Sequence, residues 1–164
     1  MPNQPNEKIE ECDFMELEST FRIVLEKPPV GVDFGLQQGK GSDYETVQTQ
    51  RSTGDDLIFE FTAKIKDDRN EAMPTIRGPF VQGPANERFV YIDIGMCAGQ
   101  KDSCWSRRLK VPLSGITWQM IDRALVEPNA ILEARVPGTG KGGGPNCATV
   151  KPFDGWKVVR RKSE

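Results

Sequence analysis

The sequence contains no histidine, and this absence narrows the chemistry that one chain can perform. Catalytic arrangements that pair serine or cysteine with an imidazole are excluded, so any general base must be Asp, Glu, Lys, Tyr or Cys. The cysteines are few, and no two of them stand at C-x-x-C spacing: Cys12, Cys97, Cys104 and Cys147. Structural zinc needs four close nitrogen or sulfur ligands, so we expect no metal site, and no motif indicates a cofactor.

Long apolar runs and a strong net charge are missing as well. No segment approaches the roughly 20 apolar residues of a membrane-spanning helix, and the first residues are polar and acidic, unlike a signal peptide. The net charge is −2, so no broad positive field would draw the protein to nucleic acid or to an anionic membrane. We therefore expect a soluble, cytoplasmic protein with reduced cysteines that binds neither nucleic acid nor membrane.

The residues that are present fit one globular domain. The chain has 164 residues, of which 37% are hydrophobic and 28% are charged, enough to bury one core. We expect residues 1–17 to form a disordered or loosely attached extension and residues 18–160 to form a single β-rich domain. Residues 161–164 are expected to be a basic tail.

Apolar and polar residues alternate with period two through most of this domain, which predicts β-strands. In the clearest strand, 57–66, one face is predicted to be core: Leu57, Phe59, Phe61, Ala63 and Ile65. Further strands are expected over 21–25, 32–37, 44–51, 89–94, 105–113, 130–136 and 156–159. A helix is expected over 117–127, with Thr117 as its N-cap and with Trp118, Ile121 and Leu125 on one face. Seven or eight short strands and one short helix predict a mainly β fold, an antiparallel β-sandwich or a partly open barrel.

Segment 44–51 favours strand structure but has no apolar face, because Thr, Gln and charged residues occupy both sides. Such a strand is expected at a sheet edge or in solvent more than in the wall of a cavity. The turn that follows it is short, so we expect a hairpin between 44–51 and 57–66.

The glycines of the loop 138–145 formally match a nucleotide-binding pattern, since Gly138, Gly140 and Gly143 follow G-x-G-x-x-G. That pattern binds phosphate only where a helix begins directly after it. Here Pro145 and a β-prone segment, 147–150, come next. We interpret the loop as a surface loop without a nucleotide site.

Asp93 stands on the polar face of strand 89–94, next to Tyr91. A carboxylate that becomes buried there needs a cationic or hydrogen-bonding partner. The loop to strand 105–113 is about ten residues, short enough to make the two strands antiparallel neighbours. We expect Arg107 to lie opposite Asp93 and to form a partly buried ion pair with it. The alternative is an arginine that packs its stem and extends its guanidinium into water.

Five segments resemble those of a known family: 31–37, 44–51, 78–84, 89–95 and 105–110. The chain is similar, over about 21–121, to an uncharacterised bacterial family known only as a domain of unknown function. The resemblance implies a bacterial and cytoplasmic origin. It implies no activity, ligand or catalytic residue.

Three functions remain open from the sequence. The first is a non-catalytic module that binds a small polar or anionic ligand, because several polar and aromatic residues gather near apolar strands: Tyr44, Gln48, Gln82, Arg88, Tyr91, Asp93, Trp105 and Arg107. The second is a protein-interaction or accessory module, or a homo-oligomer, that uses an edge strand. The third is a histidine-free enzyme in which Asp93 acts as base while Tyr91 and Arg107 stabilise an oxyanion.

Overall fold

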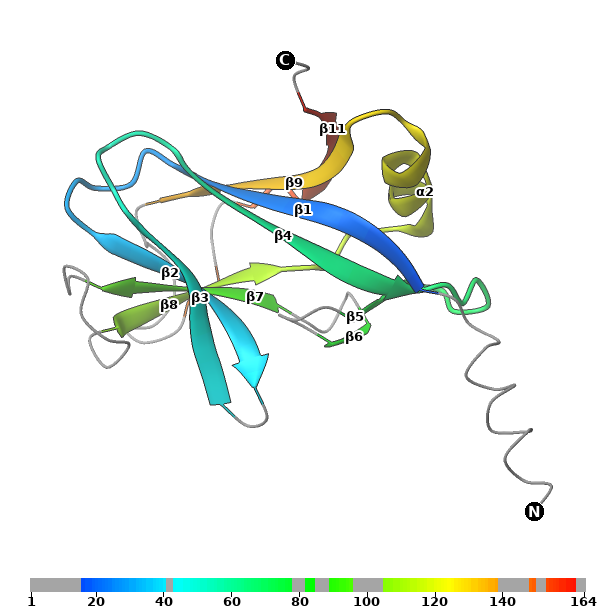
Figure 1. Ribbon diagram of the computed structural model, residues 1–164, viewed down its shortest axis with the longest axis horizontal. Coiled ribbons are helices and arrows are strands. Elements are labelled where there is room, and N and C mark those ends of the chain that lie inside the picture. The colour runs from blue at the N-terminus through cyan, green and yellow to red at the C-terminus, as the bar shows by residue number, and fades with distance from the viewer. Residues whose placement is uncertain are drawn as a thin grey trace.

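The structure is a computed structural model, and it describes residues 16–40, 43–77, 82–84, 89–95, 105–138, 148–149 and 153–161. Two β-sheets pack against each other, one with six strands and one with five among these residues (Figure 1). Sheet A has the order β11-β9-β1-β4-β5-β6, with bounds Trp156–Arg160, Ala130–Pro137, Glu16–Glu26, Leu57–Lys66, Thr75–Arg77 and Gln82–Pro84. Sheet B has the order β10-β8-β7-β2-β3, with bounds Ala148–Thr149, Trp105–Pro112, Phe89–Gly95, Asp33–Lys40 and Asp43–Arg51.

This architecture confirms the mainly β fold that the alternating pattern predicts. Eight of the strands in the described part of the chain have five or more residues, as expected, and three shorter ones join them. Most neighbours are antiparallel, but β1 pairs with β9 in parallel and β8 pairs with β10 in parallel. The first strand starts at Glu16, two positions before the expected domain boundary.

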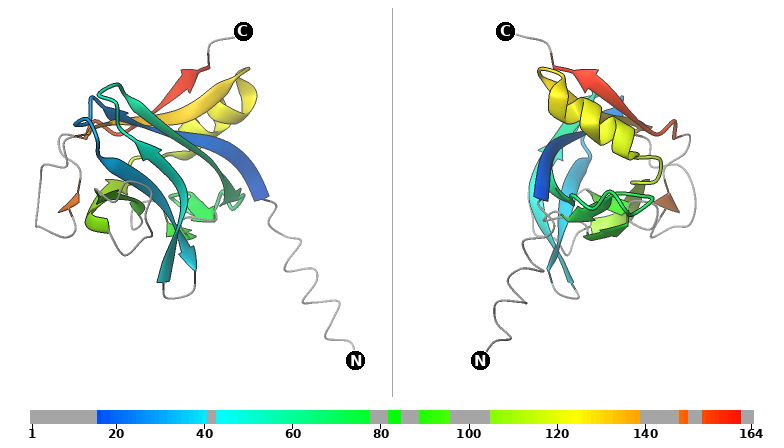
Figure 2. Two further views of the ribbon diagram at one scale, coloured as in Figure 1. Left: turned by 60° about the vertical axis from the view of Figure 1, so that its left-hand side comes forward. Right: turned by 90° about the vertical axis from the view of Figure 1, so that its right-hand side faces the viewer.

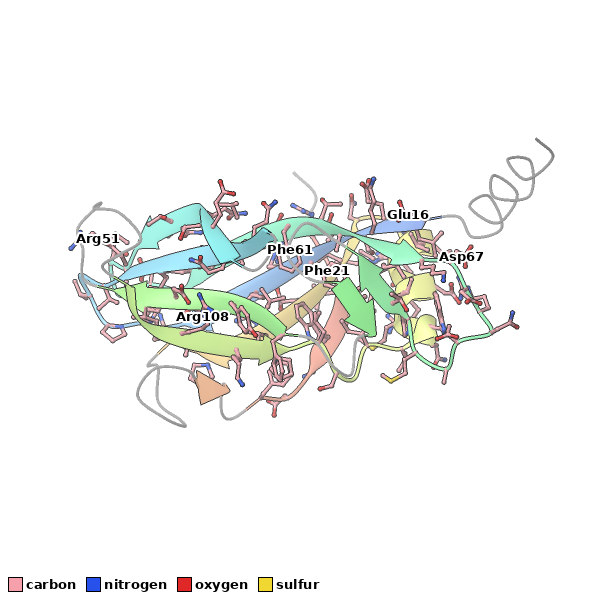
Figure 3. All side chains as sticks on the ribbon, turned by 90° about the horizontal axis from the view of Figure 1, so that it is seen from below. Glu16, Phe21, Arg51, Phe61, Asp67 and Arg108 are labelled. Atoms are coloured by element: carbon pink, nitrogen blue, oxygen red, sulfur yellow. The ribbon has the colours of Figure 1, made fainter. Side chains whose placement is uncertain are left out.

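The core lies between the two sheets and uses the predicted face of β4. Its five apolar side chains are between 0% and 8% exposed. Phe21 of β1 stacks on Phe61 of β4 with ring centroids 5.4 Å apart (Figure 3). Trp156 of β11 meets Phe21 edge-on, with ring centroids 5.5 Å apart. Aromatic pairs in these geometries stabilise a fold by more than their buried area alone accounts for. These two contacts link β4, β1 and β11 of sheet A.

Helix α2, Trp118–Val126, begins where the sequence predicts. The hydroxyl of its N-cap, Thr117, accepts a hydrogen bond from the Met120 amide at 3.2 Å. The helix lies beside β9 and β11 (Figure 2) and buries Ile121 completely. Leu125 is 41% exposed, so the apolar face is shorter than the i, i+3, i+7 pattern suggests.

The expected hairpin between β3 and β4 is wrong. β3 pairs with β2, whereas β4 pairs with β1 and β5, so the turn between β3 and β4 carries the chain from one sheet to the other. In the described structure β3 lies at one edge of sheet B, which confirms the expected edge position. Two side chains of β3 donate hydrogen bonds to the backbone of β4 in sheet A. Gln48 donates to the Glu60 carbonyl at 2.8 Å, and Gln50 donates to the Ile58 carbonyl at 2.6 Å. In the described structure β5 pairs with only the last three residues of β4, and these amides bond carbonyls in the part of β4 before them, so side chains link the two sheets there.

Candidate functional site

Asp93 is buried on β7 and forms an ion pair with Arg108 of β8. The residue is 4% exposed, and both of its carboxylate oxygens accept hydrogen bonds. Arg108 donates from Nε to Oδ1 at 2.7 Å and from Nη2 to Oδ2 at 3.1 Å (Figure 3 labels Arg108). The same guanidinium lies 4.8 Å from the centroid of the Tyr91 ring. Such a two-pronged, charge-assisted contact holds Asp93 in place and occupies both of its oxygens.

The expected pairing of Asp93 with Arg107 is therefore wrong by one residue. Asp93 lies opposite Arg108, while Arg107 lies opposite Ile94. The register shifts between Ile94 and Gly95, so β8 carries one extra residue next to the loop. A shift of one residue moves every side chain to the other face of the strand. Without that bulge, the pairing at the loop would place Arg107 opposite Asp93.

Of the remaining sequence-predicted site residues, Gln48 is the one whose side chain the structure describes. Gln48 lies opposite the buried Leu36 and faces sheet A, whereas Asp93 lies opposite Gly35 on the outward side of sheet B. The side chains of four others are outside the described parts: Tyr44, Gln82, Trp105 and Arg107. Arg88 and all four cysteines also lie outside them.

Of the glycine-rich loop, only Gly138 is described, and it has a packing role. Its amide donates to the Glu26 carbonyl at 2.9 Å. A Cβ atom at this position would lie 2.8 Å from Pro28 and 2.9 Å from the same carbonyl. Only glycine fits this close approach of two backbone segments.

A network of charged side chains covers the outward face of sheet A. Arg22 of β1 donates to Glu60 of β4 at 2.9 Å and to Glu133 of β9 at 3.1 Å. Arg161 donates to the second oxygen of Glu60 at 2.7 Å. Burial raises the pKa of Glu60, but the hydrogen bonds from Arg22 and Arg161 outweigh it and hold that pKa below its ordinary value.

Arg135 extends this network along β9. Its guanidinium donates to Glu133 at 3.1 Å and to Glu26 at 3.2 Å. The hydrogen bond to Glu26 and the charge of Glu133 raise the pKa of Arg135 above its ordinary value. The carboxylate of Glu133 is 9% exposed, and its two oxygens are taken by Arg135 and Arg22.

A cleft of about 170 Å³ opens beside this network, on the outward side of β1, β9 and β11. We call it the sheet-A cleft, and its lining consists of Glu26, Glu133, Arg135, Pro137, Asp154, Gly155 and Lys157. The side chains of Asp154 and Lys157 make no hydrogen bond or ion pair with any other described residue. The cleft therefore combines a floor of paired charges with two unpaired groups of opposite sign.

The sequence analysis missed the sheet-A cleft. Asp154 and Lys157 belong to no recognisable sequence motif. The cleft forms because β11 pairs with β9, which brings Lys157 opposite Glu133. The available signal was Glu133, a carboxylate between Leu132 and Ala134 in a strand that is apolar apart from Glu133 and Arg135. A buried charge in such a position needs cationic partners.

The described parts of the chain contain no group of three or more Asp, Glu, Cys or His side chains placed to hold a metal ion. None of the helical segments that the structure describes has the length and apolar composition needed to cross a membrane.

Comparison with known proteins assigns the chain to a family. A family model described as a family of unknown function, DUF5990, matches residues 19–159. The chain belongs to this family. No curated protein and no solved structure matches it. The part that matches DUF5990 contains the Asp93–Arg108 pair and every residue of the sheet-A cleft.

Proposed function

We propose that this DUF5990 protein is a non-catalytic binding module whose ligand is a small polar molecule in the sheet-A cleft. The observation that carries the proposal is a cleft lined by five charged side chains, which come from β1, β9, β11 and the segment just before β11. Convergent polar groups on a rigid scaffold are what orients a bound ligand. Three of the five are carboxylates, so a ligand that carries only negative charge fits this lining less well than a polar or mixed one.

The geometry of Asp93 gives little support to the enzyme that the sequence left open. Both of its oxygens accept hydrogen bonds from Arg108, and the residue is 4% exposed. A general base must reach the proton it removes within hydrogen-bond distance. We therefore assign Asp93 a structural role in this proposal.

Thermal unfolding with small polar probes tests the proposal. Glycine, methylammonium, acetate, phosphate and glycerol are compared at 100 mM and matched ionic strength. A dissociation constant of about 1 mM would add about 2.7 kcal/mol at this concentration and raise the Tm by roughly 5 to 10 °C. We expect at least one probe to give a saturable shift that the double variant Asp154→Ala/Lys157→Ala loses.

The matched control is Asp55→Ala/Lys64→Ala, which removes the same charges from exposed positions outside the sheet-A cleft. This control should keep the shift. The proposal is overturned if no probe shifts the Tm, or if both double variants respond as the unchanged protein does.

A second function rests on the strand order. In the described parts of the chain, β3 lies at one edge of sheet B and β11 at one edge of sheet A, and an edge strand offers backbone groups to a partner strand. Under this alternative the protein is an interaction module or a homo-oligomer. Light scattering after size exclusion separates the two ideas, because a monomer at every concentration that still binds a small probe supports the ligand-binding function.

A bacterial and cytoplasmic setting belongs to the same proposal. It is supported by the polar composition, with a net charge of −2, and by the resemblance described above.

A further inference from the structure

We propose that the ligand of the sheet-A cleft is a small zwitterion, with its carboxylate on Lys157 and its ammonium group on Asp154. This inference rests on the proposed function and names the class of its ligand. It follows from the pairing of charges around the cleft, from the position of Lys157 in the sheet and from the size of the cleft.

The charges of the cleft divide into paired and unpaired groups. Arg135 binds both Glu26 and Glu133, with nitrogen-to-oxygen distances of 3.2 and 3.1 Å. Asp154 and Lys157 are left without a partner among the described residues, and they do not pair with each other. Among the described residues, the cleft thus presents one free anion and one free cation beside a floor whose charges are already paired.

The position of Lys157 explains why its ammonium group is free. Lys157 of β11 lies directly opposite Glu133 of β9, where opposite charges usually attract. Both oxygens of Glu133 are already bound, one by Arg22 and the other by Arg135. Glu133 is therefore not available to Lys157, and the ammonium group of Lys157 lies at the cleft without a partner among the described residues.

Gly155 separates the two free groups. It has a φ of +91°, a left-handed conformation that favours glycine, at the point where the chain enters β11. Asp154 precedes this turn and Lys157 follows it on the strand. A ligand with a charge at each end can contact both groups, whereas a ligand with one charge would leave the other group unpaired and near a like charge.

The volume limits the length of the ligand. A cavity of about 150 Å³ is known to hold benzene, with about six heavy atoms. The sheet-A cleft, at about 170 Å³, has room for a molecule of similar size. Amino acids with two to four carbon atoms meet this limit and differ from one another in the distance between their charges.

Titration followed by amide chemical shifts in NMR spectra tests the inference. The probes are glycine, β-alanine and 4-aminobutyrate, with glycinamide lacking the carboxylate and N-acetylglycine lacking the ammonium group. We expect one zwitterion to bind up to about fivefold more tightly than either singly charged analogue, since fivefold is the upper range for one exposed ion pair. The amides of Gly155 and Lys157 should shift with the same saturation curve.

Two variants assign the charges. Lys157→Met should lower the affinity for the zwitterion to that for glycinamide and leave glycinamide binding unchanged. Asp154→Asn should lower it to the affinity for N-acetylglycine. The matched controls Lys64→Met and Asp55→Asn should change neither value, and the Tm of each variant shows whether it is folded.

The possible failures are distinct. If none of the three zwitterions binds more tightly than glycinamide and N-acetylglycine, or if the control variants have an effect as large as that of Lys157→Met, the zwitterion assignment is overturned while the binding of a polar ligand stands. If none of the probes named here or above binds, both the assignment and the proposed function are overturned.

Discussion

Removing either partner of the Asp93–Arg108 pair is expected to destabilise the protein, and by unequal amounts. The side chain of Asp93 is 6% exposed, and that of Arg108 is 29% exposed. Arg108→Ala leaves a buried carboxylate without its cation, for which a cost of about 3 to 5 kcal/mol is typical. Asp93→Ala leaves a guanidinium that reaches water and still lies over Tyr91, so we expect about 1.5 to 3 kcal/mol, as for a hydrogen bond to a charged group.

A second ion pair of the same chemistry provides the control. Arg69 donates two hydrogen bonds to Asp122, at 3.0 and 2.8 Å, but these side chains are 45% and 52% exposed. Exposed pairs contribute about 0 to 1 kcal/mol, since water and salt screen them. Asp122→Ala should therefore cost less than Asp93→Ala, although both lose a carboxylate bound by two nitrogens of arginine.

Equilibrium unfolding in urea measures these differences, and the double variant Asp93→Ala/Arg108→Ala completes a mutant cycle. Its cost should be smaller than the sum of the two single costs by more than about 0.5 kcal/mol, the usual limit of additivity. Additive costs, or a larger cost for Asp93→Ala than for Arg108→Ala, would refute the reasoning from burial.

Two further predictions concern sheet A. Gly138→Ala should lower the free energy of unfolding by about 1 to 3 kcal/mol, because the added Cβ would lie 2.8 Å from Pro28; an unchanged urea midpoint would contradict this. Hydrogen bonds from Arg22 and Arg161 hold the pKa of Glu60 below 4.5 against the effect of burial. The ionised carboxylate of Glu60 therefore stabilises the fold above pH 4.5, and this stabilisation is lost as the pH falls through the lowered pKa. Stability measured from pH 6 down to pH 3 should decline less steeply in Glu60→Gln than in the unchanged protein.

Local pattern predicted the strands well because alternation and turn residues are local properties. The strand over 57–66 has the expected bounds, and β7 and β9 each extend one residue beyond them. Pairing was harder to predict. The short turn after Arg51 looked like that of a hairpin, but β4 pairs edge to edge with β1, which lies far away in sequence, while its apolar face is buried between the two sheets.

The predicted partner of Asp93 was wrong because of the register between β7 and β8. The aliphatic faces of β7 and β8 must lie on the same side of the sheet, and Ile92 does lie opposite Leu109. That match places Asp93 opposite Arg108 and assigns Arg107 to the register position of Ile94. The constraint was contained in the sequence, since Arg107 and Leu109 are two positions apart and so share a face of the strand, but counting residues around the loop could not detect the bulge.

The sheet-A cleft could not be predicted for a different reason. Its charges come from three segments that meet only when β1, β9 and β11 are in register. Each segment alone has the composition of an ordinary solvated surface. Which charges of the cleft stay unpaired depends on which residues bind Glu133. One of these residues is Arg22, which is more than a hundred residues away in the sequence.

The central place of β1 in sheet A has a consequence for synthesis on the ribosome. β1 lies between β4 and β9, and Arg22 and Glu133, neighbours in the parallel pair, are 111 residues apart. At about 5 to 20 residues per second, roughly 5 to 20 s pass between the appearance of the two strands. Throughout that time the edge of β1 that later pairs with β9 has no partner strand and can pair with other chains. The same strand carries the core-facing side chains Phe21, Ile23 and Leu25. Slower translation of the segment before β9 should therefore lower the yield of folded protein, and chaperones that cover open strands should restore it.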